Sequence, residues 1–176
     1  RLLKIMRKGG WRKAMAFKKF EKKPAVGIVM GSDSDFEVMQ ESLAVLKKFD
    51  IPCEVTVASA HRSPERAATF ASTARERNVR VIIAGAGHAA HLAGVLAAHT
   101  TLPVIGVPID SSCLQGWDAL LSTVQMPPGI PVATVSIGKP GARNAGILAV
   151  QMLALTDDDL HARLRSFKAE MAESVA

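Results

Sequence analysis

The chain has 176 residues, of which 48% are apolar and 22% are charged, a composition typical of one globular domain with a buried core. Its formal net charge of +6 is unevenly distributed, because residues 1–23 carry ten Lys and Arg against one acid and the remainder carries a small excess of acids. The basicity therefore belongs to this segment and says little about the ligand of the domain, which is itself mildly acidic.

Residues 1–23 form a basic segment before the first predicted element. A nucleic-acid-binding arm and an organelle-targeting peptide are the two functional interpretations, since the segment is nearly free of acids. It lacks serine and contains more lysine than arginine, which argues against targeting. We interpret this segment as an N-terminal extension that is not part of the fold.

From Pro24 onward, buried strands alternate with amphipathic helices. The first helix is predicted to begin at Ser34, and Ser63-Pro64-Glu65 gives the second an N-cap, a proline at its first position and an acid in its first turn. In chain order the predicted strands are 25–30, 53–58, 79–84, 102–107 and 132–137, and the later helices are 88–98, 116–124 and 141–155.

This alternation, with short connections and nearly continuous apolar strands, predicts a parallel sheet covered by helices on both faces. Five such strands fit an α/β fold of the flavodoxin-like kind, a three-layer α/β/α sandwich with a five-stranded parallel sheet. We expect the domain to span residues 24–160 and residues 161–176 to form a C-terminal helix or tail.

Residues 81–98 form an apolar stretch that is long enough to resemble a membrane span. Two histidines and three glycines interrupt it, and its β-branched residues, apart from Val95, lie at its start. We therefore expect a buried strand, a glycine loop and a buried helix, without membrane association. The two cysteines are not closely spaced and no secretory leader is recognisable, so a cytoplasmic location is expected.

Polar residues gather in the loops after the first three predicted strands. These loops can share one pocket, because ligands of such sheets bind outside the carboxyl ends of the strands. Hydroxyls, a guanidinium and amides at a helix start favour a phosphate, and a nearby carboxylate suits ribose hydroxyls. The sequence thus predicts a sugar phosphate ligand. The phosphate residues are Ser32, Ser34, Ser59 and Arg62, the ribose residue is Asp35, and the second and third loops add His61, Gly85, Gly87, His88 and His91.

Several of these residues also have purely structural interpretations. Ser34 and Glu37 fit a capping box, and Asp33 fits the favourable negative charge at a helix start. A single loop histidine such as His61 is more often solvated or structural than catalytic. No cluster of His, Cys or acids has metal-ligand spacing, and no complete phosphate-loop or dinucleotide glycine motif occurs. We expect no metal, ATP or dinucleotide cofactor.

Six segments in order give the chain a specific resemblance, which covers about residues 25–156. It resembles the class I N5-carboxyaminoimidazole ribonucleotide mutases of purine biosynthesis. The resemblance implies a cofactor-free homo-octamer whose small-molecule substrate is a ribose phosphate bearing an imidazole, and whose reaction moves a carboxylate from the exocyclic nitrogen to ring carbon C4. The segments are GSDSDF, SAHRSP, GAGHAAHLAG, LPVIGVPI, DALLSTVQMPPGIPVATVSIG and GARNAGILAVQMLAL.

The resemblance also implies a role for each site residue. His61 is expected to transfer the proton, and the predicted phosphate and ribose residues keep the roles given above. A third group is expected to surround the migrating carboxyl group. Its members are Gly85, Ala86, Gly87, His91 and Leu92.

Two residues depart from the family pattern G-A-G-G-A-A-H-L-P-G, since His88 replaces a glycine and Ala93 a proline. A glycine there allows positive φ, which a histidine adopts less readily. Two rival functions therefore stay open. One is direct carboxylation of aminoimidazole ribonucleotide by carbon dioxide, as in the class II relatives, although the SAHR loop favours class I. The other is a non-catalytic ribonucleotide-binding module.

Overall fold

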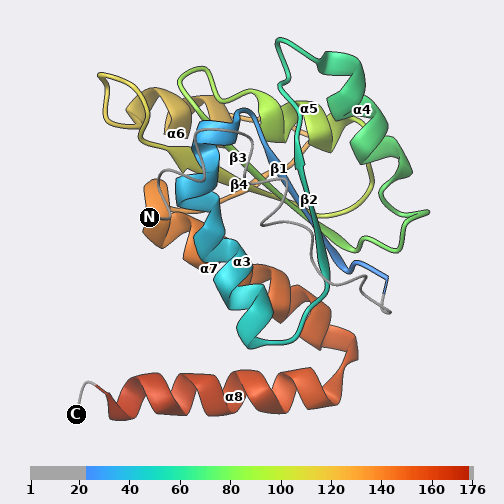
Figure 1. Cartoon of the computed structure of the whole chain (residues 1–176), viewed down its shortest axis with the longest axis vertical. Coiled ribbons are helices and arrows are strands. Elements are labelled where there is room, and N and C mark those ends of the chain that lie inside the picture. The colour runs from blue at the N-terminus through green and yellow to red at the C-terminus, as the bar shows by residue number, and fades with distance from the viewer. Residues whose placement is uncertain (1–22, 175–176) are drawn as a thin grey trace, which may run out of the picture.

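The computed structural model describes residues 23–174, so nearly all of the basic N-terminal segment lies outside the described residues. The described chain forms a parallel sheet between two layers of helices (Figure 1). The strand order is β2-β1-β3-β4-β5, which is the flavodoxin-like order. The predicted fold class is confirmed. The strands are β1 (Val26–Met30), β2 (Cys53–Val57), β3 (Val81–Gly87), β4 (Val104–Ile109) and β5 (Ala133–Thr134).

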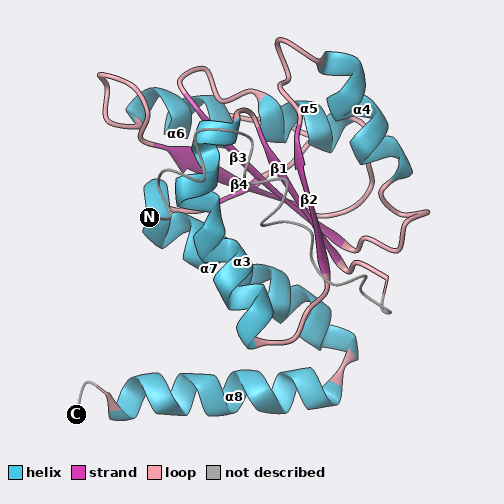
Figure 2. Cartoon of the chain, viewed as in Figure 1, coloured by secondary structure: helices cyan, strands magenta, loops and turns pink. Residues whose placement is uncertain are grey.

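Helices cover both faces of the sheet (Figure 2). Successive strand residues face opposite sides, so Ile28 packs in the core under one helix layer and Val29 in the core under the other. This explains why the central strands are almost continuously apolar. The first layer contains α3 (Phe36–Lys48), α7 (Gly138–Leu153) and α8 (Asp158–Glu173), and the second contains α4 (Pro64–Thr73), α5 (Leu92–Ala98) and α6 (Trp117–Val124).

Small residues allow α3 and α7 to pack closely. A Cβ atom on Gly146 of α7 would lie 2.9 Å from Val45 Cβ and 3.1 Å from the Ser42 carbonyl oxygen. The buried Ser42 hydroxyl donates a hydrogen bond to the Ala142 carbonyl at 2.5 Å. The position of α3 matters for function, because this helix starts directly after the loop that follows β1.

The C-terminal helix α8 crosses below the rest of the fold (Figure 1). It buries Leu160, Leu164 and Phe167, whose spacing places them on one face of the helix. The ring of Phe167 packs edge-to-face on Phe49 at 5.5 Å between centroids. The Asp157 side chain caps the start of α8 by accepting the Leu160 amide hydrogen.

The main differences from the predicted elements concern β3, α5 and β5. β3 continues to Gly87 instead of ending at residue 84, because Ala86 and Gly87 pair with Pro108 and Ile109 of β4. α5 consequently begins at Leu92, four residues later than predicted. The fifth strand has only two residues, Ala133 and Thr134, which pair with Ile105 and Gly106 of β4 at the edge of the sheet. Within residues 23–174, no helix has the length and apolarity needed to cross a membrane.

Candidate active site

A cavity of about 600 Å³ opens at the carboxyl ends of β1, β2, β3 and β4. This is the edge where strand order reverses between β1 and β3, as expected for a ligand site in this fold. Every predicted site residue lines the cavity except Gly85, which is buried below it. The lining residues are Gly31, Ser32, Ser34, Asp35, Ser59, Ala60, His61, Arg62, Ala86, Gly87, His88, Ala89, His91, Leu92 and Ser111.

The loop after β1 folds into a short 3-10 turn, Asp33–Asp35, that orients its serines and Asp35. Ser32 caps this turn, and its backbone amide donates to the Asp35 carboxylate at 2.9 Å. The capping box therefore joins Ser32 and Asp35, not Ser34 and Glu37 as the structural interpretation of the sequence supposed. The Ser34 hydroxyl donates to Ser32 Oγ at 3.0 Å, so both hydroxyls lie together at the cavity wall.

Asp35 is the most buried carboxylate of the site, with 6% of its surface exposed. Burial raises the pKa of this carboxyl, and the backbone amides of Ser32 and Gly31 oppose the shift. A buried acceptor next to exposed serine hydroxyls is suited to hydrogen bonds from a neutral hydroxyl-bearing ligand.

The loop after β2 presents Arg62 and His61 to the cavity. Ser63 stabilises this loop, because its Oγ accepts the Ser59 amide at 2.9 Å and donates to the Ser59 carbonyl at 3.2 Å. The Ser59 hydroxyl in turn accepts the Arg62 amide at 3.2 Å. The Arg62 guanidinium reaches the Gly31 carbonyl at 3.5 Å, which brings a cation next to the serines after β1. This group of hydroxyls and one cation can bind a phosphate.

His61 and His91 come from different loops and form a direct contact. His61 Nε2 lies 2.8 Å from His91 Nδ1, and the two rings meet edge-to-face at 86°. One ring donates and the other accepts, according to the tautomers. The contact places a pair of proton-transfer groups at the wall of the same cavity as the phosphate-type cluster.

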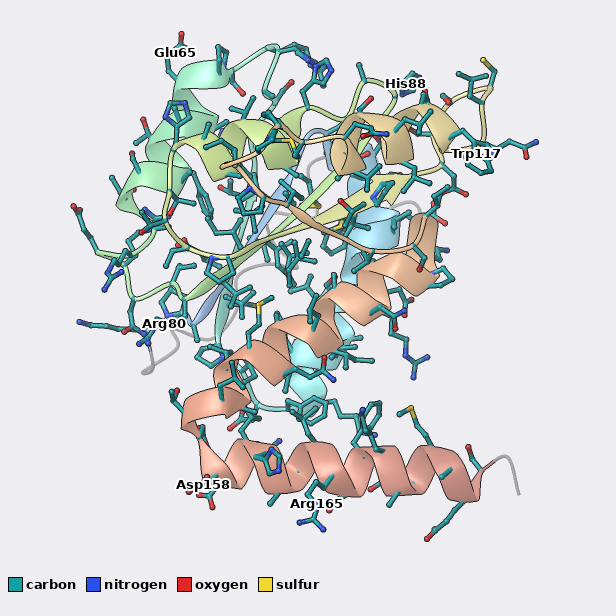
Figure 3. The ribbon with its side chains drawn as sticks, turned by 180° about the vertical axis from the view of Figure 1, so that it is seen from behind. Glu65, Arg80, His88, Trp117, Asp158 and Arg165 are labelled. Carbon is teal, nitrogen blue, oxygen red and sulfur yellow. The ribbon has the colours of Figure 1, made fainter. Side chains whose placement is uncertain are left out.

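Two glycines of β3 are required by close packing at the cavity floor. A Cβ atom on Gly85 would overlap the thioether of Met39, and one on Gly87 would overlap the Ser111 hydroxyl. The next residue, His88, has φ of 54°, so it adopts the left-handed conformation that a glycine adopts without strain. The ring of His88 lies at the cavity rim with Nδ1 3.1 Å from Ser111 Oγ. Figure 3 shows His88 near α6, at the end of the molecule opposite α8.

The structure adds Ser111 to the predicted residues of the site. Ser111 follows β4, so the rule that placed the first three loops at this edge extends to the fourth strand. Within residues 23–174, no group of three or more His, Cys, Asp or Glu side chains is arranged to hold a metal ion.

Comparison with known proteins gives consistent results. Residues 25–174 match the family model described as AIR carboxylase. The chain is 57% identical over 154 residues to an N5-carboxyaminoimidazole ribonucleotide mutase of Mycobacterium tuberculosis, covering 88% of this chain and 87% of the relative. It is 58% identical over 141 residues to the mutase of Bacillus subtilis, covering 80% and 87%. The crystal structure of Treponema denticola PurE superposes with a TM-score of 0.78 at 27% identity, covering 86% of this chain and 94% of that one.

Proposed function

The chain belongs to the AIR carboxylase family, and we infer that it is an N5-carboxyaminoimidazole ribonucleotide mutase, an isomerase of purine biosynthesis. The observation that carries this inference is the histidine pair, His61 and His91, beside a phosphate-type cluster in one cavity. The two relatives described above are named as mutases, which favours this reaction over direct carboxylation and over a non-catalytic binding module.

We assign the ends of the substrate to the two sides of the cavity. Ser32, Ser34, Ser59 and Arg62 bind the phosphate, since their hydroxyls and guanidinium cluster between the loops after β1 and β2. Asp35 accepts hydrogen bonds from the ribose hydroxyls. The imidazole end then lies toward β3, against Ala86, Gly87 and Leu92.

The reaction needs one proton to be delivered and one removed. The N–COO⁻ bond of the substrate breaks and releases carbon dioxide, while the exocyclic nitrogen takes a proton from His61. Ring carbon C4 then attacks the carbon dioxide, and His61 removes the proton from C4, so the histidine ends as it began. The contact with His91 orients His61 in this cycle. Ala86, Gly87 and Leu92 offer no polar side chain to solvate carbon dioxide.

We further propose that the protein is a cytoplasmic homo-octamer without cofactors, as the family resemblance implies. An apolar stripe on α6 supports self-association. Trp117 is 63% exposed, Leu121 53% and Val124 47%, and their spacing places them on one face of the helix. The apolar residues of α7, by contrast, pack within the chain against α3 and the sheet.

A direct assay tests the reaction. Purified protein is mixed with N5-carboxyaminoimidazole ribonucleotide, or with aminoimidazole ribonucleotide and bicarbonate, and the 4-carboxylate product is followed. Faster conversion of the carboxyamino compound is the expected result. Faster conversion of aminoimidazole ribonucleotide with bicarbonate would make the protein a carboxylase, and no conversion of either would leave it a binding module. His161→Asn, a change at an exposed position of α8, serves as the active control.

A further inference from the structure

His88 and Ser111 form a connection across the rim of the cavity that the reaction above does not use. His88 follows β3 and Ser111 follows β4, and their side chains meet at 3.1 Å. The hydroxyl of Ser111 also lies directly over Gly87, where a Cβ atom would overlap it. Gly87 and His88, two consecutive residues at the end of β3, therefore both contact the Ser111 hydroxyl at the cavity wall.

The sheet order, taken with the proposed phosphate position, indicates which part of the substrate this hydroxyl faces. Arg62 and Ser59 follow β2, whereas Ser111 follows β4, and β1 and β3 lie between those strands. Neighbouring strands are about 4.8 Å apart, so the two ends of the cavity are separated by roughly 14 Å. With the phosphate at β2 and β1, the hydroxyl at β4 lies on the side of the imidazole and its carboxylate.

His88, which makes this contact, has an uncommon backbone conformation. Its φ of 54° is rare for residues other than glycine, yet its side chain is exposed and gains no burial in return. Such a strained residue at a cavity is a reason to look for a functional role. The contact to Ser111 is the hydrogen bond that its ring makes.

We propose that Ser111 contacts the carboxylate of the substrate and that His88 is the positioning residue that orients the Ser111 hydroxyl. When His88 Nδ1 carries the hydrogen, it donates to Ser111 Oγ. The Ser111 hydroxyl hydrogen is then free to point into the cavity and donate to a carboxylate oxygen. This inference rests on the proposed function, since it takes a carboxylated imidazole ribonucleotide as the ligand.

Two ligands that differ only in the carboxylate test the proposal. Dissociation constants are measured by calorimetry for aminoimidazole ribonucleotide and for its 4-carboxylate, the reaction product. Ser111→Ala should weaken binding of the 4-carboxylate by about tenfold to a hundredfold, as expected for one hydrogen bond to a charged group. The affinity of the Ser111→Ala variant for aminoimidazole ribonucleotide should equal that of wild type. Cys113→Ala, an exposed change in the same loop, is the matched control and should alter neither.

His88 variants separate positioning from a general structural role. His88→Gly should lose affinity for the 4-carboxylate while its unfolding midpoint stays equal or rises, because glycine adopts this φ without strain. His88→Asn should restore much of the affinity, since asparagine tolerates the left-handed region and its amide can donate. The double variant His88→Gly with Ser111→Ala should bind no more weakly than Ser111→Ala alone.

Three results would overturn the proposal. They are equal losses for both ligands in Ser111→Ala, additive losses in the double variant, and unchanged 4-carboxylate affinity in His88→Gly. A wild-type protein that binds neither nucleotide would instead refute the proposed function itself, and the inference with it.

Discussion

His61 lies at the cavity wall with its ring against His91, and the serines and Arg62 of the phosphate-type cluster line the same cavity. We predict that His61→Asn abolishes turnover but still binds the ribonucleotide, because phosphate and ribose contacts lie on other residues. Acid–base catalysis of this kind contributes roughly 10²–10⁴-fold. Single-turnover kinetics and calorimetry on the same preparation measure both properties, and retained activity above about one per cent would contradict the role.

Arg62 is the cation that the structure places next to the serines after β1. Arg62→Ala should weaken binding of the ribonucleotide by about 1.5–3 kcal/mol, the usual value for hydrogen bonds to a charged group. Arg66→Ala, an exposed change in α4 outside this cavity, should leave affinity unchanged. Equal affinities of both variants would show that the phosphate binds elsewhere.

Asp35 gives a pH-dependent prediction, because burial raises the pKa of its carboxyl above the ordinary value of 3.8. The folded protein therefore holds the proton more tightly than the unfolded chain, and this contribution to stability is lost as pH rises through the folded pKa. Below pH 3.8, the free energy of unfolding of Asp35→Asn should be similar to that of wild type. Toward neutral pH, the variant should become more stable than wild type, because only wild type loses this contribution. Denaturant unfolding across this range measures the difference.

An opposite trend, with the variant losing stability relative to wild type as pH rises, would mean that hydrogen bonds to Asp35 outweigh its burial. The expected trend implies that the wild-type carboxylate is retained for ligand binding at some expense of stability. Asp35→Asn should therefore also bind the ribonucleotide more weakly than wild type.

The residues that line the cavity were largely predictable from sequence, because the carboxyl edge of a parallel sheet collects the loops after its strands. The capping partner of Ser32 was not, since both Ser32–Asp35 and Ser34–Glu37 have the same spacing of serine and acid. The 3-10 turn ahead of α3 distinguishes the two pairs, because it places Ser32 at the N-cap and Asp35 at the third position of the turn. Ser111 was missed because no motif surrounds it, although its place after a predicted strand was a usable signal.

At the scale of elements, Gly146 sets the distance between α7 and α3, and α3 begins at the site. Gly146→Ala should lower the free energy of unfolding by up to about 2 kcal/mol, since overpacking costs about 1–3 kcal/mol and the gain in helix propensity returns about 1. Asn144→Ala, on the exposed side of α7, is the control, because it raises helix propensity without placing a new atom against α3. If Gly146→Ala were as stable as this control, the two helices would not be in close contact.

The existence and order of the elements followed from hydrophobic periodicity, but their ends did not. β3 runs three residues beyond its predicted end through Ala86 and Gly87, residues of low strand propensity that pair with β4. That pairing is a property of the whole sheet and leaves no local signal. The apolar run at 132–137 likewise predicts a longer β5 than the two residues that pair with β4.

At the scale of the whole molecule, the stripe of Trp117, Leu121 and Val124 on α6 is expected to be covered by other copies of the chain. Light scattering at micromolar concentration should give eight times the chain mass of 18.7 kDa. Trp117→Glu combined with Leu121→Glu should dissociate the assembly, because charges are disfavoured in the core of an interface. Gln40→Glu combined with Ala44→Glu, two exposed changes on α3, is the charge-matched control.

A monomeric wild-type protein would refute the octamer. An octameric double variant would instead show that a surface other than α6 holds the copies together.

The cavity takes residues from loops spread over positions 31–111, and this has a consequence for how the chain folds. β1 pairs with both β2 and β3, so the histidine pair and the phosphate side can assemble from the first three strands. Ser111 arrives only when β4 docks on β3. A carboxylated nucleotide that contacts both sides is therefore expected to bind most tightly to chains whose fourth strand is in place. By mass action it stabilises those completed molecules and leaves partly folded ones exposed to proteolysis.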